Sequence, residues 1–288
     1  MKPIKFAYAK IPNMGDLLNE FIMDRVFCVP YKHTRRVWEY ELTGIGSFLD
    51  NLFYGEEKNS KNPLKRYTKN FLLSTSRTEC YTWGTGFIKD VTDSRTRLSR
   101  PNVHFMAVRG QKSKESVEKI LGHEINPVLG DGGILTPYMF DKPIPKKYKI
   151  GIIPHFREQD CPQLGYLIKQ YPEAHIINLR GEPLQVMQEI AECEIIISSS
   201  LHGLILADAF RIPNMRIYLT DAPKGTGFKF DDYYSAYGLD VPARIISSEK
   251  DVPNINELID NYQVTDEMVK TMQNGMYDCL NTHLKNRN

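Results

Sequence analysis

The sequence predicts an α/β protein of two doubly wound parallel sheets flanked by helices, with one more helix at its C-terminal end. Three observations predict this fold class. Short apolar runs alternate with amphipathic stretches along most of the chain. Residues 141–149, rich in proline and lysine, interrupt that alternation and are typical of a linker. The 288 residues, 41% of them hydrophobic, are enough to build two cores.

The first predicted domain covers residues 1–142. Its apolar runs are short and end in polar or glycine-containing turns. Residues 35–77 are irregular and rich in Lys, Asn and Ser, so we expect them to form a mobile loop or a lid over a cleft. The expected strands are 4–9, 80–86, 103–108 and 125–130, and the expected helices are 17–27 and 111–121.

The second predicted domain covers residues 147–263, and its strands are continuous apolar runs, which suit a parallel sheet covered on both faces. Two Rossmann-like domains with a cleft between them follow from this pattern. The expected strands are 150–154, 175–179, 194–198 and 215–219, and the expected helices are 163–171, 183–193 and 203–210.

Residues 264–288 contain the last expected helix, from Val264 to Leu284. Thr265 is its expected N-cap, and two acidic residues follow in the first turn, where they favour the positive end of the helix dipole. One face is apolar, which predicts packing back on the first domain. That stripe consists of Val269, Met272, Met276, Leu280 and Leu284.

Charge and cysteine content narrow the class of protein. The net charge of +2, from 37 basic and 35 acidic residues, gives no bulk attraction to nucleic acid or to an anionic membrane. The five cysteines include no CxxC pair, which argues against a disulfide framework or a zinc site. No apolar run reaches membrane-spanning length and no leader peptide is evident, so we expect a cytoplasmic protein, with peripheral contact at the inner face of the membrane as an option.

The strongest local signal is the run IIISSSLHGLILADAFRIP, in which an apolar strand ends in three serines and a helix follows. Ligands of open α/β sheets bind at the carboxyl ends of strands, and a helix N-terminus favours an anion. His202 would face such a ligand as a proton donor. The alternative is that the serines only cap the helix. The candidate anion-binding residues here are Ser198, Ser199, Ser200, Leu201 and Gly203.

Basic side chains follow other predicted strands. Arg109 ends the strand at 103–108, and its planar fork matches a carboxylate or a phosphate. His155 and Arg157 follow the first strand of the second domain. Lys224 and Lys229 lie in a glycine-containing loop that is suited to closing on a phosphate. The alternatives are a surface arginine, an incidental loop histidine and a solvated turn.

Near the N-terminus, NMGDLLNEF places glycine and polar residues between the first strand and the first helix. Glycine there allows close approach of a ligand, and Asp16 either accepts sugar hydroxyls or caps the helix. WGTGF and LGDGGIL add glycines after strands, but neither is a GxGxxG fingerprint, so dinucleotide binding has weak support. The candidate ligand-binding residues of the first domain are Gly15, Asp16, Asn19, Gly84, Gly86 and Asp131.

In this order, NMGDLLNEF, WGTGF, AVRGQKS, LGDGGIL, IGIIPHF, SSSLHGLILADAFRIP and GFKFDDYYSA resemble the motif series of the polysaccharide pyruvyl transferase family, from about residue 11 to residue 238. The resemblance implies a GT-B-like fold with phosphoenolpyruvate in the cleft. It implies that Arg109 binds this donor and that His202 is catalytic. Ser200 stands where relatives have arginine, so Arg157, Lys224 or Lys229 must supply the missing phosphate contact.

The resemblance also implies a reaction, in which a pyruvate ketal forms on a sugar of a bacterial surface or capsular polysaccharide precursor. Phosphoenolpyruvate is then a co-substrate, no cofactor or metal is required, and the acceptor is expected to be a lipid-linked oligosaccharide. The first domain would bind the acceptor and the second the donor.

Two other functions remain open from the residues alone. One is a GT-B-like glycosyltransferase that uses a nucleotide sugar. The other is a non-catalytic glycan- or anion-binding protein.

Overall fold

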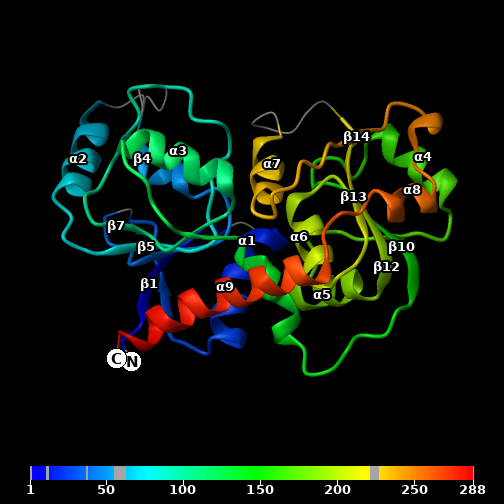
Figure 1. Ribbon diagram of the computed structural model, residues 1–288, viewed down its shortest axis with the longest axis horizontal. Helices are drawn as coiled ribbons and strands as arrows, with labels where there is room; N and C mark the ends of the chain where they lie inside the picture. The colour runs from blue at the N-terminus through cyan, green and yellow to red at the C-terminus, as the bar shows by residue number, and fades with distance from the viewer. Residues whose placement is uncertain (1, 11–12, 37, 55–62, 221–226, 288) are drawn as a thin grey trace.

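The computed structural model describes residues 2–10, 13–36, 38–54, 63–220 and 227–287. It shows a mixed α/β chain with two five-stranded parallel sheets, one in each half, and helices packed around them (Figure 1). The fold class predicted from the sequence is therefore confirmed at this level.

The first sheet has the strand order β2-β1-β3-β5-β7, and all its pairs are parallel. Two short two-stranded ladders accompany it, β8 with β9 and β4 with β6. The strands of this half are β1 (Ile4–Ala7), β2 (Tyr31–His33), β3 (Leu42–Thr43), β4 (Phe53–Tyr54), β5 (Cys80–Thr82), β6 (Arg97–Leu98), β7 (Val103–Phe105), β8 (Ala107–Val108) and β9 (Val128–Leu129). Its helices are α1 (Met14–Phe21), the π-helix η1 (Ile22–Val26), α2 (Pro63–Ser74), α3 (Gln111–Leu121) and the 3₁₀ segments η2 (Leu49–Asn51) and η3 (Gly132–Met139).

The second sheet has the order β11-β10-β12-β13-β14 and is also parallel. Its central strands are buried on both faces because their sequences are continuous apolar runs. The strands are β10 (Tyr148–Ile153), β11 (His175–Ile176), β12 (Cys193–Ser198), β13 (Asn214–Tyr218) and β14 (Arg244–Ile245). The helices are α4 (Pro162–Gln170), α5 (Pro183–Ala191), α6 (Leu201–Ala209), α7 (Phe228–Ser235), η4 (Glu249–Asp251), α8 (Ile255–Asp260) and α9 (Asp266–Lys285).

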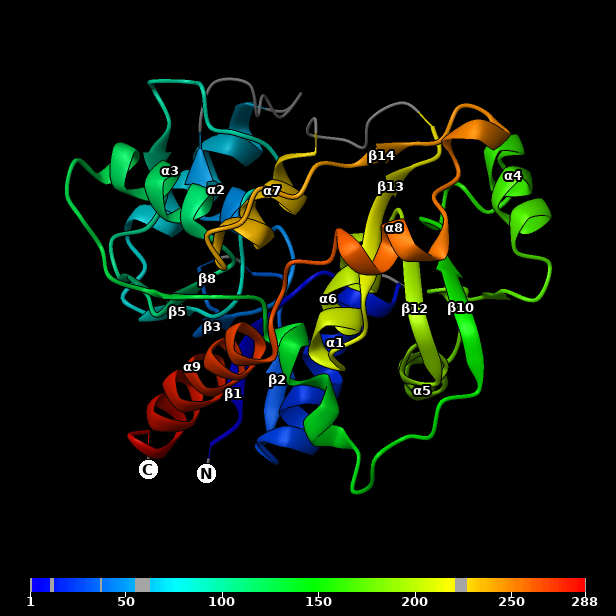
Figure 2. The ribbon, with the colours of Figure 1, turned by 45° about the vertical axis from the view of Figure 1, so that its right-hand side comes forward.

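Helix α9 packs against elements of the first half, among them β9 and η3. The hydroxyl of Thr265 accepts a hydrogen bond from the Met268 amide and so caps the helix. The Trp83 indole of the first half donates to the carbonyl of Met276 at 2.9 Å. Figures 1 and 2 both place the two termini side by side, and Arg287 pairs with Glu41 there at 3.3 Å.

The prediction of an irregular loop over residues 35–77 is wrong where the structure describes this segment, because β3, β4, η2 and α2 lie within it. The sequence did not indicate these elements, because the segment is polar and its two strands have only two residues each. The expected strand 103–108 is broken at Met106, whose amide bonds back to the carbonyl of His104. The expected helix 17–27 begins earlier, at Met14, and continues as a π-helix.

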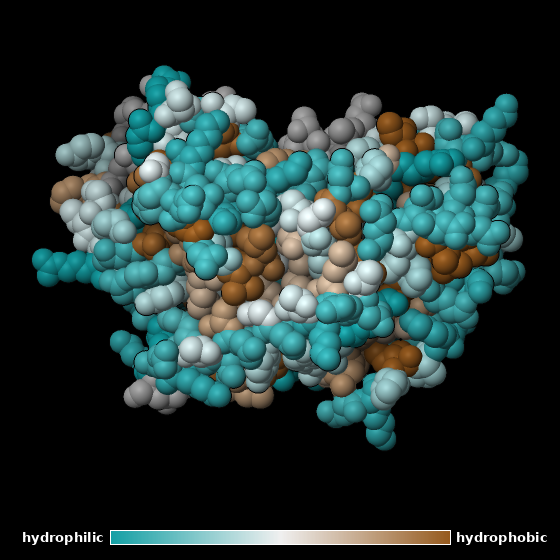
Figure 3. All heavy atoms as spheres, in the orientation of Figure 1, coloured by the Kyte–Doolittle hydropathy of each residue, from teal (hydrophilic) through white to brown (hydrophobic). Residues whose placement is uncertain are grey.

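The two halves contact each other near the loops that follow the carboxyl ends of their strands. The Met14 amide at the start of α1 donates to the carbonyl of Leu179 at 2.9 Å, and α3 of the first half packs on α7 of the second. Hydrophilic residues dominate the face in Figure 3, with hydrophobic residues in scattered groups. In the described residues, no helix combines the length and the apolar character needed to cross a bilayer.

Candidate active site

A cavity of about 310 Å³ lies between the two halves. Its walls come from the start of α1, the loop after β3, the end of β8, the loop after β10, the start of α6 and the start of α7. Most of these segments follow the carboxyl ends of strands, where open α/β sheets bind their ligands. The polar and charged side chains of its wall include Asp16, Ser47, Arg109, His155, His202 and Lys229.

His202 lies in the first turn of α6, and its imidazole rests directly on the backbone of Gly15 in α1. Its Nε2 atom is buried and has no hydrogen-bond partner among the described residues. Buried polar atoms are rarely unpaired, so this nitrogen is suited to a ligand in the cavity. Burial, together with the charges of Lys229 and Arg109, lowers the pKa of His202 to about 3. The ring is therefore neutral at pH 7.

The lowered pKa of His202 predicts acid-sensitive stability. The unfolded chain takes up the proton near pH 6.5, but the folded protein does so only near pH 3. Stability is therefore complete above pH 6.5 and is lost as the pH falls toward 3. Between pH 7 and pH 5 we expect a loss of about 2 kcal/mol from this one residue. Urea unfolding of the wild type and His202→Asn at both pH values measures it. An equal loss in the variant would contradict the assignment.

Gly15 is the reason that the imidazole can lie where it does, because a Cβ atom there would overlap its Nδ1. We expect Gly15→Ala to displace the ring and lower turnover by about 100-fold, with little loss of stability, since alanine favours the helix. Gly165→Ala is the matched control. It also lies in a helix, α4, but its Cβ would meet no atom within 4 Å. Turnover rates and urea unfolding of both variants test this prediction, and a Gly15→Ala variant with the wild-type turnover rate would contradict it.

Arg109 is almost completely buried and is held by Asp232 of α7, in the other half of the chain. Its Nε and Nη2 atoms both lie 2.9 Å from Oδ2 of Asp232. Nη2 also donates to the carbonyl of Phe87 at 2.5 Å, and Nη1 donates to Oγ of Ser47 at 3.3 Å. Since Arg109 and Ser47 both line the cavity, Nη1 is the edge of the guanidinium that a ligand can reach.

Asp232 also binds the N-terminus of α3. Its Oδ1 accepts from the Ser113 amide at 2.7 Å, and its Oδ2 accepts from the Ser113 hydroxyl at 2.6 Å. A Cβ on Gly86 would come within 2.5 Å of the Arg109 guanidinium, and one on Gly110 would overlap the carbonyl of Asp232. These two glycines allow the halves to approach closely around the buried ion pair.

Lys229, in the first turn of α7, is the second cation of the cavity. Burial, and then the positive charge of Arg109, lower its pKa to about 8. No described carboxylate lies within ion-pair distance of its ammonium group, which is therefore available to an anion. Across the cavity, burial and Lys229 lower the pKa of His155 to about 4.

The three serines have different surroundings. The Ser198 hydroxyl donates to the carbonyls of Ile153 and Ser200, both at 3.0 Å, and so ties the strand ends together. The Ser199 hydroxyl donates to Glu158 at 2.5 Å and accepts from the His155 amide at 2.8 Å. Ser200 caps α6 by position without a side-chain hydrogen bond, and it lines the cavity. Ser200 is the serine that can reach a ligand without losing a bond.

The remaining predicted donor-binding residues also differ in whether they line the cavity. Leu201 lines the cavity, whereas Gly203 packs against Ser198 and Ile153. Arg157 is exposed beyond the cavity wall. Lys224 lies outside the described residues.

Of the predicted acceptor-binding residues, Asp16 lines the cavity. Its carboxylate accepts a hydrogen bond from the side-chain amide of Asn13 at 3.1 Å, and burial raises the pKa of Asp16. Asn19 instead joins α1 to the loop after β3, by bonds to the backbone of Asp16 and Ile45. Gly84 has a φ of +70° and packs on Gly132.

Asp131 is fully buried and caps η3 through the Gly133 amide at 2.9 Å. Its other carboxylate oxygen has no hydrogen-bond partner in the described part of the chain, and burial raises its pKa to about 6. It does not line the cavity.

Two residues of the site were absent from the sequence-based prediction. Asp232 lies within the motif GFKFDDYYSA and was given no role there, and the tyrosines that follow it, which are buried, were the available sign that this face of the helix is internal. Ser47 follows a glycine after a short strand, and nothing in its pattern distinguishes it from a loop serine.

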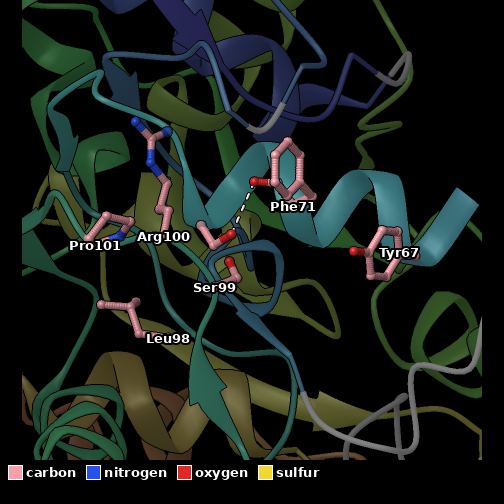
Figure 4. Close-up of a pocket in the computed structure, with 7 residues that line it drawn as sticks. Tyr67, Phe71, Leu98, Ser99, Arg100 and Pro101 are labelled. Carbon is pink, nitrogen blue, oxygen red and sulfur yellow. Dashed lines mark hydrogen bonds between the residues drawn. The ribbon is translucent and has the colours of Figure 1, made fainter.

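A second hollow, of about 500 Å³, lies beside α2 (Figure 4). The Ser74 hydroxyl within it donates to the carbonyl of Phe71 at 3.0 Å. It contains none of the predicted site residues, so the cavity between the halves is the candidate active site. The hollow is lined by Tyr67, Phe71, Ser74, Leu98, Ser99, Arg100 and Pro101.

A family model described as polysaccharide pyruvyl transferase matches residues 24–220. The chain is 27% identical to the succinoglycan biosynthesis protein ExoV of Rhizobium meliloti over 234 aligned residues. The aligned region covers 79% of this chain and 62% of that protein. It is 30% identical to an uncharacterized protein of Acanthamoeba polyphaga mimivirus over 139 aligned residues. This aligned region covers 46% of the chain and 48% of the viral protein. The chain thus spans less than two thirds of the length of both relatives. Because the family model matches more than half of its residues, the chain belongs to the polysaccharide pyruvyl transferase family.

Proposed function

We propose that this protein transfers pyruvate from phosphoenolpyruvate to a sugar of a bacterial surface polysaccharide precursor and forms a ketal there. The observation that carries the proposal is the composition of the cavity. A neutral histidine with an unpaired ring nitrogen shares one small space with two cationic side chains, Arg109 and Lys229. A donor with a carboxylate, a phosphate and a carbon that must be protonated requires these groups.

The donor is oriented by the two cations. Its carboxylate binds Nη1 of Arg109 beside Ser47, since both residues line the cavity. Its phosphate binds the Lys229 ammonium and the free amides at the start of α6. Lys229 thereby takes over the contact that the arginine at position 200 would make in relatives, and Ser200 leaves the space for it.

The donor also prepares His202 for proton transfer. The pKa of His202 is low because the site is buried and positively charged. An anionic donor offsets those charges and raises the pKa of His202, so the ring takes up a proton together with the donor. His202 then protonates the methylene carbon of phosphoenolpyruvate, and the neighbouring carbon becomes oxocarbenium-like.

The acceptor completes the reaction in two additions. One sugar hydroxyl attacks the oxocarbenium carbon, phosphate leaves, and a second hydroxyl attacks the same carbon to close the ketal. One of the two hydroxyl protons replaces the proton that His202 gave to the methyl group, and the other leaves with the phosphate. Asp16, which shares the cavity, is the proposed acceptor contact in the first half.

The arrangement of the halves is part of the proposal. A GT-B-like enzyme would bind the acceptor in residues 1–142 and the donor in residues 147–263, with the cavity at their junction. The acceptor would be a lipid-linked oligosaccharide at the cytoplasmic face of the membrane. The return of α9 to the first half supports a junction of this kind.

The test is to incubate the protein with phosphoenolpyruvate and candidate oligosaccharides, free and lipid-linked, and to follow the masses of the acceptors and the release of phosphate. We expect a pyruvyl mass gain, with phosphate released only when an acceptor is present. Release of a nucleoside diphosphate from a nucleotide sugar would instead support a glycosyltransferase. Binding of glycan without turnover of either donor would support a binding protein.

Lys229→Met is expected to raise the KM for phosphoenolpyruvate about tenfold, because a buried charge-assisted contact to the phosphate is lost. In the wild type, donor affinity should also fall as the pH rises through about 8, where Lys229 loses its proton. Initial rates against donor concentration from pH 6.5 to pH 9 measure both effects. Lys250→Met, at an exposed lysine, is the control. A tenfold change in kcat at constant KM would contradict the assigned role.

A further inference from the structure

Two arginines gather around one aromatic ring at the rim of the cavity. Arg157 and Arg180 lie in the loops that follow β10 and β11, which are neighbouring strands of one sheet. The guanidinium carbons of Arg157 and Arg180 lie 5.4 Å and 4.7 Å from the ring centroid of Phe156. Phe156 lines the cavity, whereas both arginines are exposed. The ring therefore links a pair of surface cations to the buried site.

The two loops are joined, so the pair is built into the fold. The side-chain amide of Gln159 donates to Oδ1 of Asn178 at 2.6 Å, and the backbone amide of Arg180 donates to the same oxygen at 3.0 Å. The Arg157 amide lies 3.4 Å from Nδ1 of His155, whose own amide is bound to Ser199. The backbone of Arg157 is thus bonded to a residue of the cavity, and that of Arg180 to the contact that joins the two loops.

The charge of the pair is not neutralised in the described part of the chain. Neither guanidinium has a carboxylate within ion-pair distance there. Glu158, next to Arg157 in sequence, accepts hydrogen bonds from Ser199 at 2.5 Å and from Thr220 at 2.6 Å. Glu182, two residues after Arg180, accepts the Gln185 amide at 2.9 Å and caps α5. Both arginines also contribute to the lowering of the pKa of His155 inside the cavity. Two planar cations at the rim attract an oxyanion that a guanidinium fork can bind in two places.

We propose that Arg157 and Arg180 form an oxyanion subsite at the mouth of the cavity, and that it binds an acidic group of the acceptor glycan outside the sugar that is modified. The proposal rests on the proposed function. The acceptor is the appropriate ligand because Arg109 and Lys229 already supply cations for the small donor inside, while the exposed pair faces the larger substrate that extends to solvent. The oxyanion is either a phosphate through which the glycan is linked or the carboxylate of a uronic acid.

Activity measurements with three acceptors test the subsite, namely a neutral oligosaccharide, its glycosyl phosphate, and an oligosaccharide with a neighbouring uronic acid. For the double variant Arg157→Ala, Arg180→Ala we expect kcat/KM to fall about tenfold for one or both acidic acceptors. The neutral acceptor and the KM for phosphoenolpyruvate should not change. The acidic acceptor that is affected identifies the source of the oxyanion. An equal loss for all three acceptors, or a rise in the donor KM, would overturn the proposal.

Direct binding separates this proposal from the reaction itself. Calorimetric titration with glucose 1-phosphate, methyl glucuronide and methyl glucoside requires no turnover. We expect the wild type to bind at least one of the two anions more tightly than the neutral glucoside, and the double variant to lose that preference. Arg25→Ala, at an exposed arginine of η1, is the control. Anion preference without pyruvyl transfer would refute the proposed function alone, whereas equal binding by wild type and double variant would refute the subsite.

Discussion

Replacing His202 with asparagine is expected to lower kcat for pyruvyl transfer by about a thousandfold, because a positioned general acid contributes effects of this size. Asparagine fits the space beside Gly15 but cannot carry a proton to carbon. The donor contacts at Arg109 and Lys229 stay in place, so the affinity for phosphoenolpyruvate should change little. Single-turnover rates and equilibrium binding of the donor measure the two quantities separately.

A structural role for His202 would give a different result. In that case the variant would lose folding stability and donor affinity together with activity. His123→Asn, at an exposed histidine, is the control and should be fully active. Retention of more than a tenth of the wild-type kcat by His202→Asn would remove this residue from the mechanism.

Replacing Asp232 with asparagine is expected to destabilise the protein by about 3 kcal/mol or more, since it leaves the buried Arg109 guanidinium without its counter-ion. An amide NH₂ in place of Oδ2 would also face the N–H group of Arg109 and the hydroxyl donor of Ser113, where an acceptor is required. Activity should fall as well, because Arg109 then loses the contact that holds it beside the cavity. Urea unfolding and the KM for phosphoenolpyruvate measure these effects, and Asp240→Asn, at an exposed position, is the control.

A double variant separates the two roles of this ion pair. Replacing both partners with apolar residues of similar size, as in Arg109→Met, Asp232→Leu, removes the uncompensated charge and should restore much of the stability. Donor binding should not recover, because no guanidinium remains. If the double variant bound phosphoenolpyruvate like the wild type, Arg109 would have no part in the donor site. Wild-type stability of Asp232→Asn would contradict the account of the ion pair.

The elements best predicted from the sequence are those whose signals are local. The strands β10 and β12 are long apolar runs, and α9 combines a capping threonine with one apolar stripe. Short elements were missed, because β3 and β4 have two residues each and two residues show no periodicity. The break at Met106 was also missed, because the sequence is apolar on both sides of it and shows no interruption there.

The residues of the candidate site show the same limit. A residue that follows a long strand, such as His155 or His202, can be placed at the sheet edge from the sequence. The pairing of Arg109 with Asp232 joins positions 123 residues apart in different halves, and no pattern within either segment indicates it. The sequence shows Gly15 as a glycine before a helix, but not which side chain lies against it.

By itself, the sequence determined the α/β class, the last helix and the family, because these depend on local patterns and on the order of motifs. The tertiary structure decided which residues share the cavity and in what state of charge. It placed the His202 ring on Gly15, committed most of the Arg109 guanidinium to Asp232, and left Lys229 without a described carboxylate partner. The physical reason is that burial and electrostatic fields are sums over neighbours in space, most of which are distant in the chain.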